Sequence, residues 1–281
     1  MAPRPSPPQS IAWADLRAEI DALVCVATVE VPGQGGVDAP FFGDRERCGL
    51  PPASTPVQRA VAGGYADARP TLIALRPDGD ALRDALALPD PAARLGAVRT
   101  LYVTPRFLGV LLPRIAAQLA DLGLPCADCP PGERPPSRTI AWDALAPYIA
   151  AYVWPDPVVT PDAAASGKTQ YSLHICSGRN GVATLPEPDP QIRVAAFLVT
   201  IHTDAAHERA REALRALVED PGFTALGDDA ARTAFLRARL GPSVAGDPSL
   251  RPALCATLAR FRGDTGIWVS ECDPKRPVRP T

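Results

Sequence analysis

The sequence predicts an α/β or α+β protein built from two similar halves. The phrase Ile11-Ala12-Trp13 returns as Ile140-Ala141-Trp142, and in each half a helix, a strand and a glycine-containing turn follow in the same order. Such self-similarity is typical of a duplicated structural unit. The alternative is that the halves share only the alternation of strands and helices that many α/β proteins show.

In the first half, amphipathic spacing predicts a helix over 11–23, and the β-branched run 24–31 predicts a strand that ends in a glycine-rich turn, 32–37. A long Pro-rich loop follows. The later elements that we expect are helices near 56–63, 80–88 and 105–122, and strands at 71–75 and 99–103.

The second half begins after 123–139, a stretch rich in proline and glycine that predicts a linker. We expect a helix over 140–152 with Thr139 as its cap, a strand from Gln170 to Cys176, and a second strand late in 193–203. The remaining expected elements are helices over 205–219, 228–240 and 248–262, and a final strand at 267–270.

The predicted organisation therefore has five parts. They are a disordered lead-in (1–10), a first α/β half (11–122), the linker (123–139), a second half that carries the candidate site (140–272) and a tail (273–281).

Composition limits the classes of function. The 46% hydrophobic and 21% charged residues are ordinary for a globular protein, and a net charge of −2 argues against a dedicated nucleic-acid binder. The longest apolar runs, such as 194–201, are too short to span a bilayer, and the N-terminus lacks the apolar core of a secretory signal. We therefore expect a cytoplasmic protein with no membrane or nucleic-acid partner.

The chain has seven cysteines, and free thiols are the expectation for a cytoplasmic protein. Cys25 and Cys255 have apolar neighbours and are expected to behave as small core residues.

The candidate site lies at the end of the predicted strand 170–176. If its glycine turn is aligned with that of the first half, His174 takes the place of Val29, and Cys176 that of Val31. Alternate residues of a strand share a face, and ligand sites in α/β sheets favour the carboxyl ends of strands. A histidine and a cysteine so placed can also be ordinary packing.

His202 ends the other predicted strand, and on a neighbouring strand it could reach Cys176. An imidazole beside a thiol can make a thiolate nucleophile. We predict Cys176, His174 and His202 as catalytic residues, and the turn residues as the binding site for an anionic substrate. These turn residues are Ser177, Gly178, Arg179 and Asn180.

Cys126 and Cys129 have the two-residue spacing of a zinc knuckle or a redox pair, although no second ligand pair is evident. They are weak metal candidates, with two unpaired thiols as the alternative. No cofactor is indicated.

Three functions remain open. The first is an enzyme that acts on a small polar or anionic molecule through the Cys/His site. The second is a non-catalytic interaction or accessory protein that binds a partner protein through the long Pro-rich loops, 38–55 and 155–168, because such loops often carry binding sites. The third is a Cys/His metal-binding protein.

Overall fold

The computed structural model of the chain describes residues 10–31, 35–75, 77, 79–158, 170–174, 185 and 189–273. It is a mixed fold, 62% helical, with three small two-stranded sheets in the described residues. This agrees with the α+β form of the predicted class. The chain divides into two compact units, Met1–Arg134 and Pro135–Thr281. The boundary lies inside the predicted linker, 123–139.

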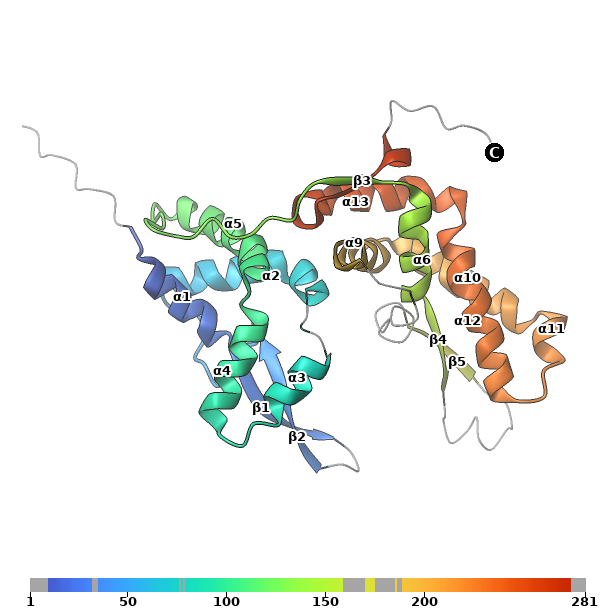
Figure 1. The fold of residues 1–281 in the computed structure, drawn as a ribbon, viewed down its shortest axis with the longest axis horizontal. Helices are drawn as coiled ribbons and strands as arrows, with labels where there is room; N and C mark the ends of the chain where they lie inside the picture. The colour runs from blue at the N-terminus through green and yellow to red at the C-terminus, as the bar shows by residue number, and fades with distance from the viewer. Residues whose placement is uncertain are drawn as a thin grey trace, which may run out of the picture. The chain divides into compact units, whose positions relative to one another are not determined.

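In its described residues, unit 1 has one hairpin and five helices, which Figure 1 shows. Its elements are α1 (Trp13–Ala22), β1 (Val24–Val31), β2 (Gly35–Phe42), α2 (Pro56–Ala74), α3 (Gly79–Leu86), α4 (Pro91–Tyr102) and α5 (Pro105–Asp121). Helices α2, α4 and α5 each begin with a side-chain cap followed directly by proline, which suits the first helical position.

The core of unit 1 lies between α1, α2 and α5, where residues such as Ile20, Val61 and Leu111 are fully buried. The antiparallel hairpin β1–β2 presents one face, its inner face, to this core. Phe42 lies against the rings of Tyr65 and Phe107, at 4.9 and 4.7 Å between centroids.

Helix α4 holds the same inner face of the hairpin. Arg94 of α4 pairs with Asp38 of β2, and the Arg99 side chain donates to the carbonyl oxygen of Val24 at 3.4 Å. The hairpin is therefore anchored on one side only by the helices that cover it.

Unit 2 has the same kinds of element in a different number (Figure 1). They are β3 (Arg138–Ile140), α6 (Trp142–Tyr152), β4 (Trp154–Val158), β5 (Gln170–His174), α9 (Pro190–Ile201), α10 (Asp204–Val218), α11 (Pro221–Thr224), α12 (Asp229–Ala245), η1 (Pro248–Leu250), α13 (Arg251–Thr265), β6 (Ile267–Val269) and η2 (Ser270–Cys272). Strand β5 pairs with β4 in an antiparallel hairpin, and β3 pairs with β6 in parallel.

Helix α9 is the central helix of unit 2, because all but three of its twelve residues are buried. Helices α6, α10 and α13 pack around it. Helix α12 packs against both α6 and strand β4, and it thereby fixes the second hairpin to the core.

Three predicted strands are helical instead. Residues 71–75 end α2, residues 99–102 end α4, and residues 193–201 form most of α9. The runs 71–75 and 193–201 are mostly apolar and lie largely in the interior, and a short apolar run fits a buried helix as well as a strand. The caps decide the outcome for α9: Asp189 accepts from the N–H groups of Gln191 and Ile192, and Pro190 begins the helix.

Two smaller expectations also change. Residues 35–37 belong to strand β2 rather than to a turn, and Thr139 lies in β3, so that Ala141 is the N-cap of α6. Residues 1–9 and 274–281 lie outside the described part of the chain.

No single helix in the described part of the chain is both long and apolar enough to cross a membrane. Helices α4 and α5 meet that criterion only when taken together, and they meet at a bend of 75°.

Candidate functional site

Strand β5 ends at His174, the one predicted site residue of this strand that the structure describes. Cys176, Ser177, Gly178, Arg179 and Asn180 all lie outside the described residues. The order of the elements does not support the alignment of His174 with Val29. β1 directly follows the Trp13 helix and β4 directly follows the Trp142 helix, so β4 rather than β5 takes the position of β1.

His174 belongs to a polar cluster on one face of the hairpin β4–β5. Trp154 lies opposite His174, and Asp156 lies opposite Ser172. The Oγ of Ser172 is 2.8 Å from Nε2 of His174, and Oδ2 of Asp156 is 3.9 Å from the same nitrogen. Arg237 of α12 completes the cluster. Its guanidinium lies 4.1 Å above the Trp154 ring and 3.5 Å from Oδ1 of Asp156.

The cluster contains a serine, a histidine and an aspartate without the geometry of a catalytic triad. In a triad the carboxylate binds Nδ1 of the imidazole and the serine binds Nε2, which orients the base and holds its tautomer. Here both groups approach Nε2. Asp156 is also occupied by the Trp154 indole N–H, at 3.1 Å. The arrangement ties the hairpin to α12 and leaves the His174 side chain 47% exposed.

His202 does not lie on a strand, which corrects the prediction on which the Cys/His site depended. It is the residue that ends helix α9. Its ring packs against Phe261 of α13, with centroids 5.1 Å apart, and its Nε2 is buried with no hydrogen-bond partner in the described structure. The neighbour of β5 in its sheet is β4, and His202 belongs to no strand in the described part of the chain.

The surroundings of His202 predict a pH-dependent stability of unit 2. Burial, and then the charges of Arg260 and His207, lower the pKa of His202 below its ordinary value of 6.5. The unfolded chain therefore binds this proton more readily, and the free energy of unfolding falls as the pH drops below about 6.5. The slope from one proton is at most about 1.4 kcal/mol per pH unit.

Urea unfolding between pH 5 and pH 8 checks this prediction. His202→Gln removes the titrating group, and we expect a flatter pH dependence than in the wild-type protein. Equal slopes in the two proteins would show that His202 does not couple folding to protonation.

All six described cysteines are paired, so the expectation of free thiols is wrong for them. The disulfides are Cys25–Cys48, Cys126–Cys129 and Cys255–Cys272. Cys25 and Cys255 are therefore cross-linked rather than simply packed. Cys126 and Cys129 are bonded to each other, and bonded sulfurs are not thiolate ligands for a metal.

A second candidate site is the outer face of the hairpin β1–β2, the face opposite to the core. Residues directly opposite each other on paired antiparallel strands share a face. The outer face includes the pairs Cys25/Phe41, Ala27/Ala39 and Val29/Val37, and the pair Val31/Gly35 continues it to the end of the hairpin. The first three pairs define the outer face below. All six side chains are apolar. Five are half-buried and Val37 is 42% exposed.

An apolar outer face is unusual, because antiparallel sheets commonly place polar residues on the side away from the core. The core cluster of unit 1 takes in Val26 and Phe42 of the inner face, but none of the six residues of the outer face. Sequence reasoning missed this face. The signal was present in 24–29 and 37–42, where both alternating sets of side chains contain apolar residues.

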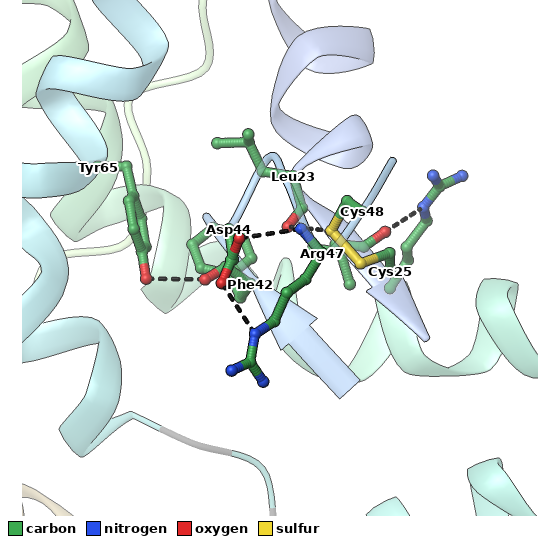
Figure 2. Close-up of a disulfide and its surroundings, with 9 residues drawn as sticks. Leu23, Cys25, Phe42, Asp44, Arg47, Cys48 and Tyr65 are labelled. Carbon is green, nitrogen blue, oxygen red and sulfur yellow. Dashed lines mark hydrogen bonds and ion pairs between the residues drawn. A yellow bond between two sulfur atoms is a disulfide. The ribbon is translucent and has the colours of Figure 1, made fainter. Parts of the chain in front are cut away.

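The segment Gly43–Thr55, called the pinned loop below, borders the outer face (Figure 2). The disulfide joins Cys48 of this loop to Cys25 of the outer face. The Arg47 guanidinium lies 4.6 Å from the centre of the Phe41 ring and also pairs with Asp44, at 3.3 Å. At the start of the loop, Gly43 has a φ of 76° and donates its N–H to the Leu23 carbonyl oxygen, at 2.9 Å.

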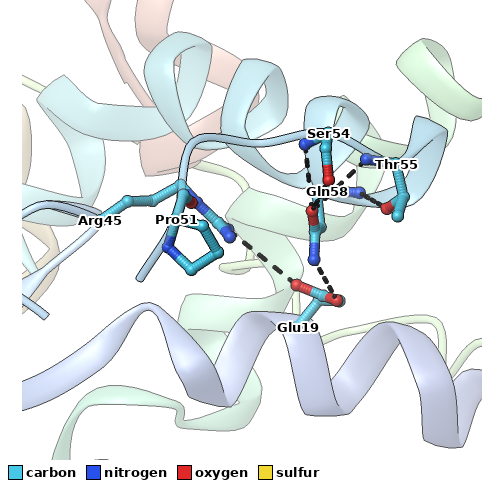
Figure 3. Close-up of polar contacts among 6 residues, drawn as sticks. All are labelled: Glu19, Arg45, Pro51, Ser54, Thr55 and Gln58. Carbon is cyan, nitrogen blue, oxygen red and sulfur yellow. Dashed lines mark hydrogen bonds and ion pairs between the residues drawn. The ribbon is translucent and has the colours of Figure 1, made fainter. Parts of the chain in front are cut away.

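The other end of the pinned loop is fixed by a polar network (Figure 3). Gln58 of α2 accepts from the N–H of Ser54 and donates to Glu19 of α1, at 3.1 and 3.0 Å. Thr55 caps α2 by accepting from the Gln58 N–H, at 3.1 Å. Arg45 lies 4.0 Å from the same Glu19 carboxylate. The loop is thus held at both ends and in its middle.

The described residues contain no group of three or more His, Cys, Asp or Glu side chains that could hold a metal ion. The chain was compared with protein-family models, with curated proteins and with solved structures, and none of the three comparisons gave a match.

Proposed function

We propose that this chain is a non-catalytic interaction protein that binds a partner protein through unit 1. The docking surface is the outer face of the hairpin β1–β2 together with the adjoining pinned loop. The observation that carries the proposal is the apolar character of the pairs Cys25/Phe41, Ala27/Ala39 and Val29/Val37 on the outer face, where the Val37 side chain is 42% exposed.

Two further features support this docking surface. Burial of exposed apolar side chains is the main driving force of protein association, and apolar surface rimmed by polar groups marks interaction sites. The rim here includes Arg47 and Asp44. The pinned loop is ordered before binding, and a preordered loop loses less conformational entropy when a complex forms.

The enzyme interpretation is the weaker one. Its catalytic assembly needed His202 on a strand beside Cys176, and His202 ends a helix with its ring against Phe261. A small-molecule substrate and a role for His174 with Cys176 stay predictions.

The cytoplasmic location also stays a prediction. The three disulfides are the observation that weighs against it, because cytoplasmic thiols are kept reduced.

We also propose that the two units are copies of one ancestral unit. In each, the last long helix ends at a glycine with a φ of 67°, Gly123 or Gly266. The next segment pairs in parallel with the residue two positions before the first helix: Cys126 with Ile11 in unit 1, and Val269 with Ile140 in unit 2.

The residues that follow also correspond. Two residues after the paired position, an acidic side chain accepts from the backbone N–H of the tryptophan that begins the first helix. Asp128 accepts from Trp13 at 2.6 Å, and Glu271 accepts from Trp142 at 3.0 Å. A disulfide-bonded cysteine comes next in both units, Cys129 and Cys272. Agreement in pairing, capping and order supports duplication over simple alternation of elements.

Substitution of Val37 by aspartate tests the proposed function. A charge buried in an apolar interface costs several kcal/mol when it is desolvated, so we expect partner affinity to fall at least about tenfold. Leu122→Asp is the matched control, since Leu122 is 49% exposed and belongs to the end of α5 rather than to the hairpin. Each protein is immobilised, proteins retained from cell extract are quantified by mass spectrometry, and a retained protein is then purified and titrated.

The expected result is a protein that the wild type and Leu122→Asp bind equally well and that Val37→Asp binds weakly. Both variants should retain the stability of the wild type within about 0.5 kcal/mol, as exposed substitutions usually do. If no protein distinguishes Val37→Asp from Leu122→Asp, the docking surface is wrong. If light scattering shows that the wild type alone forms Val37-dependent dimers, the partner is a second copy and not a different protein.

A further inference from the structure

The covalent link between the pinned loop and the outer face is the disulfide Cys25–Cys48 (Figure 2). Hydrogen bonds hold the two ends of the loop, at Gly43 and at Ser54–Thr55. The turn between them is closed by its own backbone, for example from Leu50 N–H to the Arg45 carbonyl oxygen at 2.8 Å. Leu50 packs on the core and Arg45 lies 4.0 Å from the Glu19 carboxylate, and the disulfide adds the covalent attachment of this turn to strand β1.

We infer that the form of this protein that is competent to bind is the product of a dithiol oxidation, and that the redox state of Cys25 and Cys48 controls the docking surface. This inference rests on the proposed function of that surface. The reaction that must supply the active chain is thiol–disulfide exchange with a disulfide donor, either a protein or a small molecule.

The exchange is balanced in two steps. The thiolate of one cysteine, for example Cys48, attacks a sulfur of the donor disulfide, forms a mixed disulfide and releases one donor thiolate. The thiolate of Cys25 then attacks the sulfur of Cys48, forms the Cys25–Cys48 bond and releases the second donor thiolate. Two electrons and two protons pass from the chain to the donor.

Reduction reverses these steps and frees the turn from the outer face. Arg47 then keeps its cation–π contact with Phe41 without the covalent link at Cys25, which lies directly opposite Phe41. Exposed cation–π contacts are weak, so the turn is expected to move away from the hairpin in part of the population. The rim of the docking surface loses its fixed shape, while the apolar pairs of the hairpin remain.

The disulfide Cys126–Cys129 provides a matched control within unit 1. It joins residues close in sequence, and it lies after α5, with Cys126 paired to Ile11 and not to the hairpin. Its loss should leave the pinned loop unchanged.

The experiment uses the full chain in three forms: wild type, Cys25→Ser with Cys48→Ser, and Cys126→Ser with Cys129→Ser. Hydrogen–deuterium exchange is followed in the peptides that cover 43–55 and α5, and the Val37-dependent partner is titrated against each form. Without Cys25 and Cys48, the amides of 45–50 should exchange at least about tenfold faster and partner affinity should fall at least about tenfold. The control should behave as the wild type does.

The peptides of α5 report whether unit 1 is still folded. If it is not, the wild-type protein is measured in graded dithiol reductant, and exchange in 45–50 should rise before exchange in α5. Equal exchange in the oxidised and reduced loop would overturn the inference.

Faster hydrogen–deuterium exchange in 45–50 with unchanged partner affinity would overturn the redox control of binding, but it would not contradict the proposed docking surface. If no Val37-dependent partner exists, the proposed function is wrong, and so is the redox control of binding. Whether the disulfide holds the loop in place is decided separately, by hydrogen–deuterium exchange in 45–50. Protein purified from its natural source with thiols blocked should contain the Cys25–Cys48 peptide pair. Free thiols at both positions would also overturn the inference.

Discussion

Replacement of Gly64 by valine is expected to destabilise unit 1 by about 3 kcal/mol or more and to leave unit 2 folded. Gly64 lies in α2 at its crossing with α5. A Cβ atom there would stand 2.6 Å from Cγ1 of Ile115 and 2.8 Å from its backbone nitrogen. The helices must separate to admit the side chain, and this separation opens the core that also holds the hairpin and α1.

The control for this variant is Gly96→Val in α4, where a Cβ atom meets nothing within 4 Å. Valine has a slightly higher helix propensity than glycine, so this substitution should leave the stability of unit 1 unchanged or raise it by a few tenths of a kcal/mol. Hydrogen exchange resolved by peptide measures the free energy of opening in each unit. Equal destabilisation by the two variants would show that the α2–α5 crossing is not tightly packed.

Partner binding gives Gly64→Val a second readout. The outer face and the pinned loop both depend on unit 1, because Thr55 and Gln58 belong to the start of α2. A variant that opens unit 1 should therefore lose the Val37-dependent partner. If it retains that partner, the docking surface does not lie on this unit.

Sequence patterns were sufficient where local chemistry decides the structure. The β-branched run 24–31 forms β1, and the helix expected near 105–122 is α5, which begins at Pro105 after the cap Thr104. They were insufficient for α9. Val194 to Ile201 is apolar on every side because other helices surround it, so its periodicity carries no information about helix or strand.

The error at α9 caused the error at the candidate site. With 193–203 read as a strand, His202 became a neighbour of Cys176, and the Cys/His assembly followed. The sequence could not predict the polar cluster around His174 for a different reason. Asp156 and Arg237 join it through the pairing of β4 with β5 and the packing of α12, which are long-range contacts that no local pattern encodes.

The disulfides illustrate the same limit. The chain has seven cysteines, and even the six that are paired allow fifteen pairings, among which sequence alone cannot choose. The pairing of Cys25 with Cys48 depends on β1 lying beside the pinned loop, and the apolar outer face depends on the register of β1 with β2. The disulfide pairing and the apolar outer face can therefore be recognised only once the positions and the register of the strands are known.

Gly241→Val is the corresponding prediction for unit 2. Gly241 lies in α12 where it crosses α6, and a Cβ atom there would overlap the backbone of Ala150, at 2.8 Å from its carbonyl carbon and 2.9 Å from its Cα. The obstacle is backbone, so no side-chain rotation relieves it. We expect unit 2 to lose about 3 kcal/mol or more of its free energy of unfolding, while unit 1 keeps its own.

The matched control is Gly263→Val in α13, where a Cβ atom has open space. Helix α12 also carries Arg237, so the Gly241 variant should separate the Arg237 guanidinium from Trp154 and Asp156. The fluorescence of Trp154 measures this change in a protein whose other tryptophans are replaced by phenylalanine. The Gly64 and Gly241 variants together test whether each unit folds on its own, as two copies that each close by a parallel pairing should. Loss of protection in both units from either substitution would mean that the chain folds as one cooperative body, and would count against independent copies.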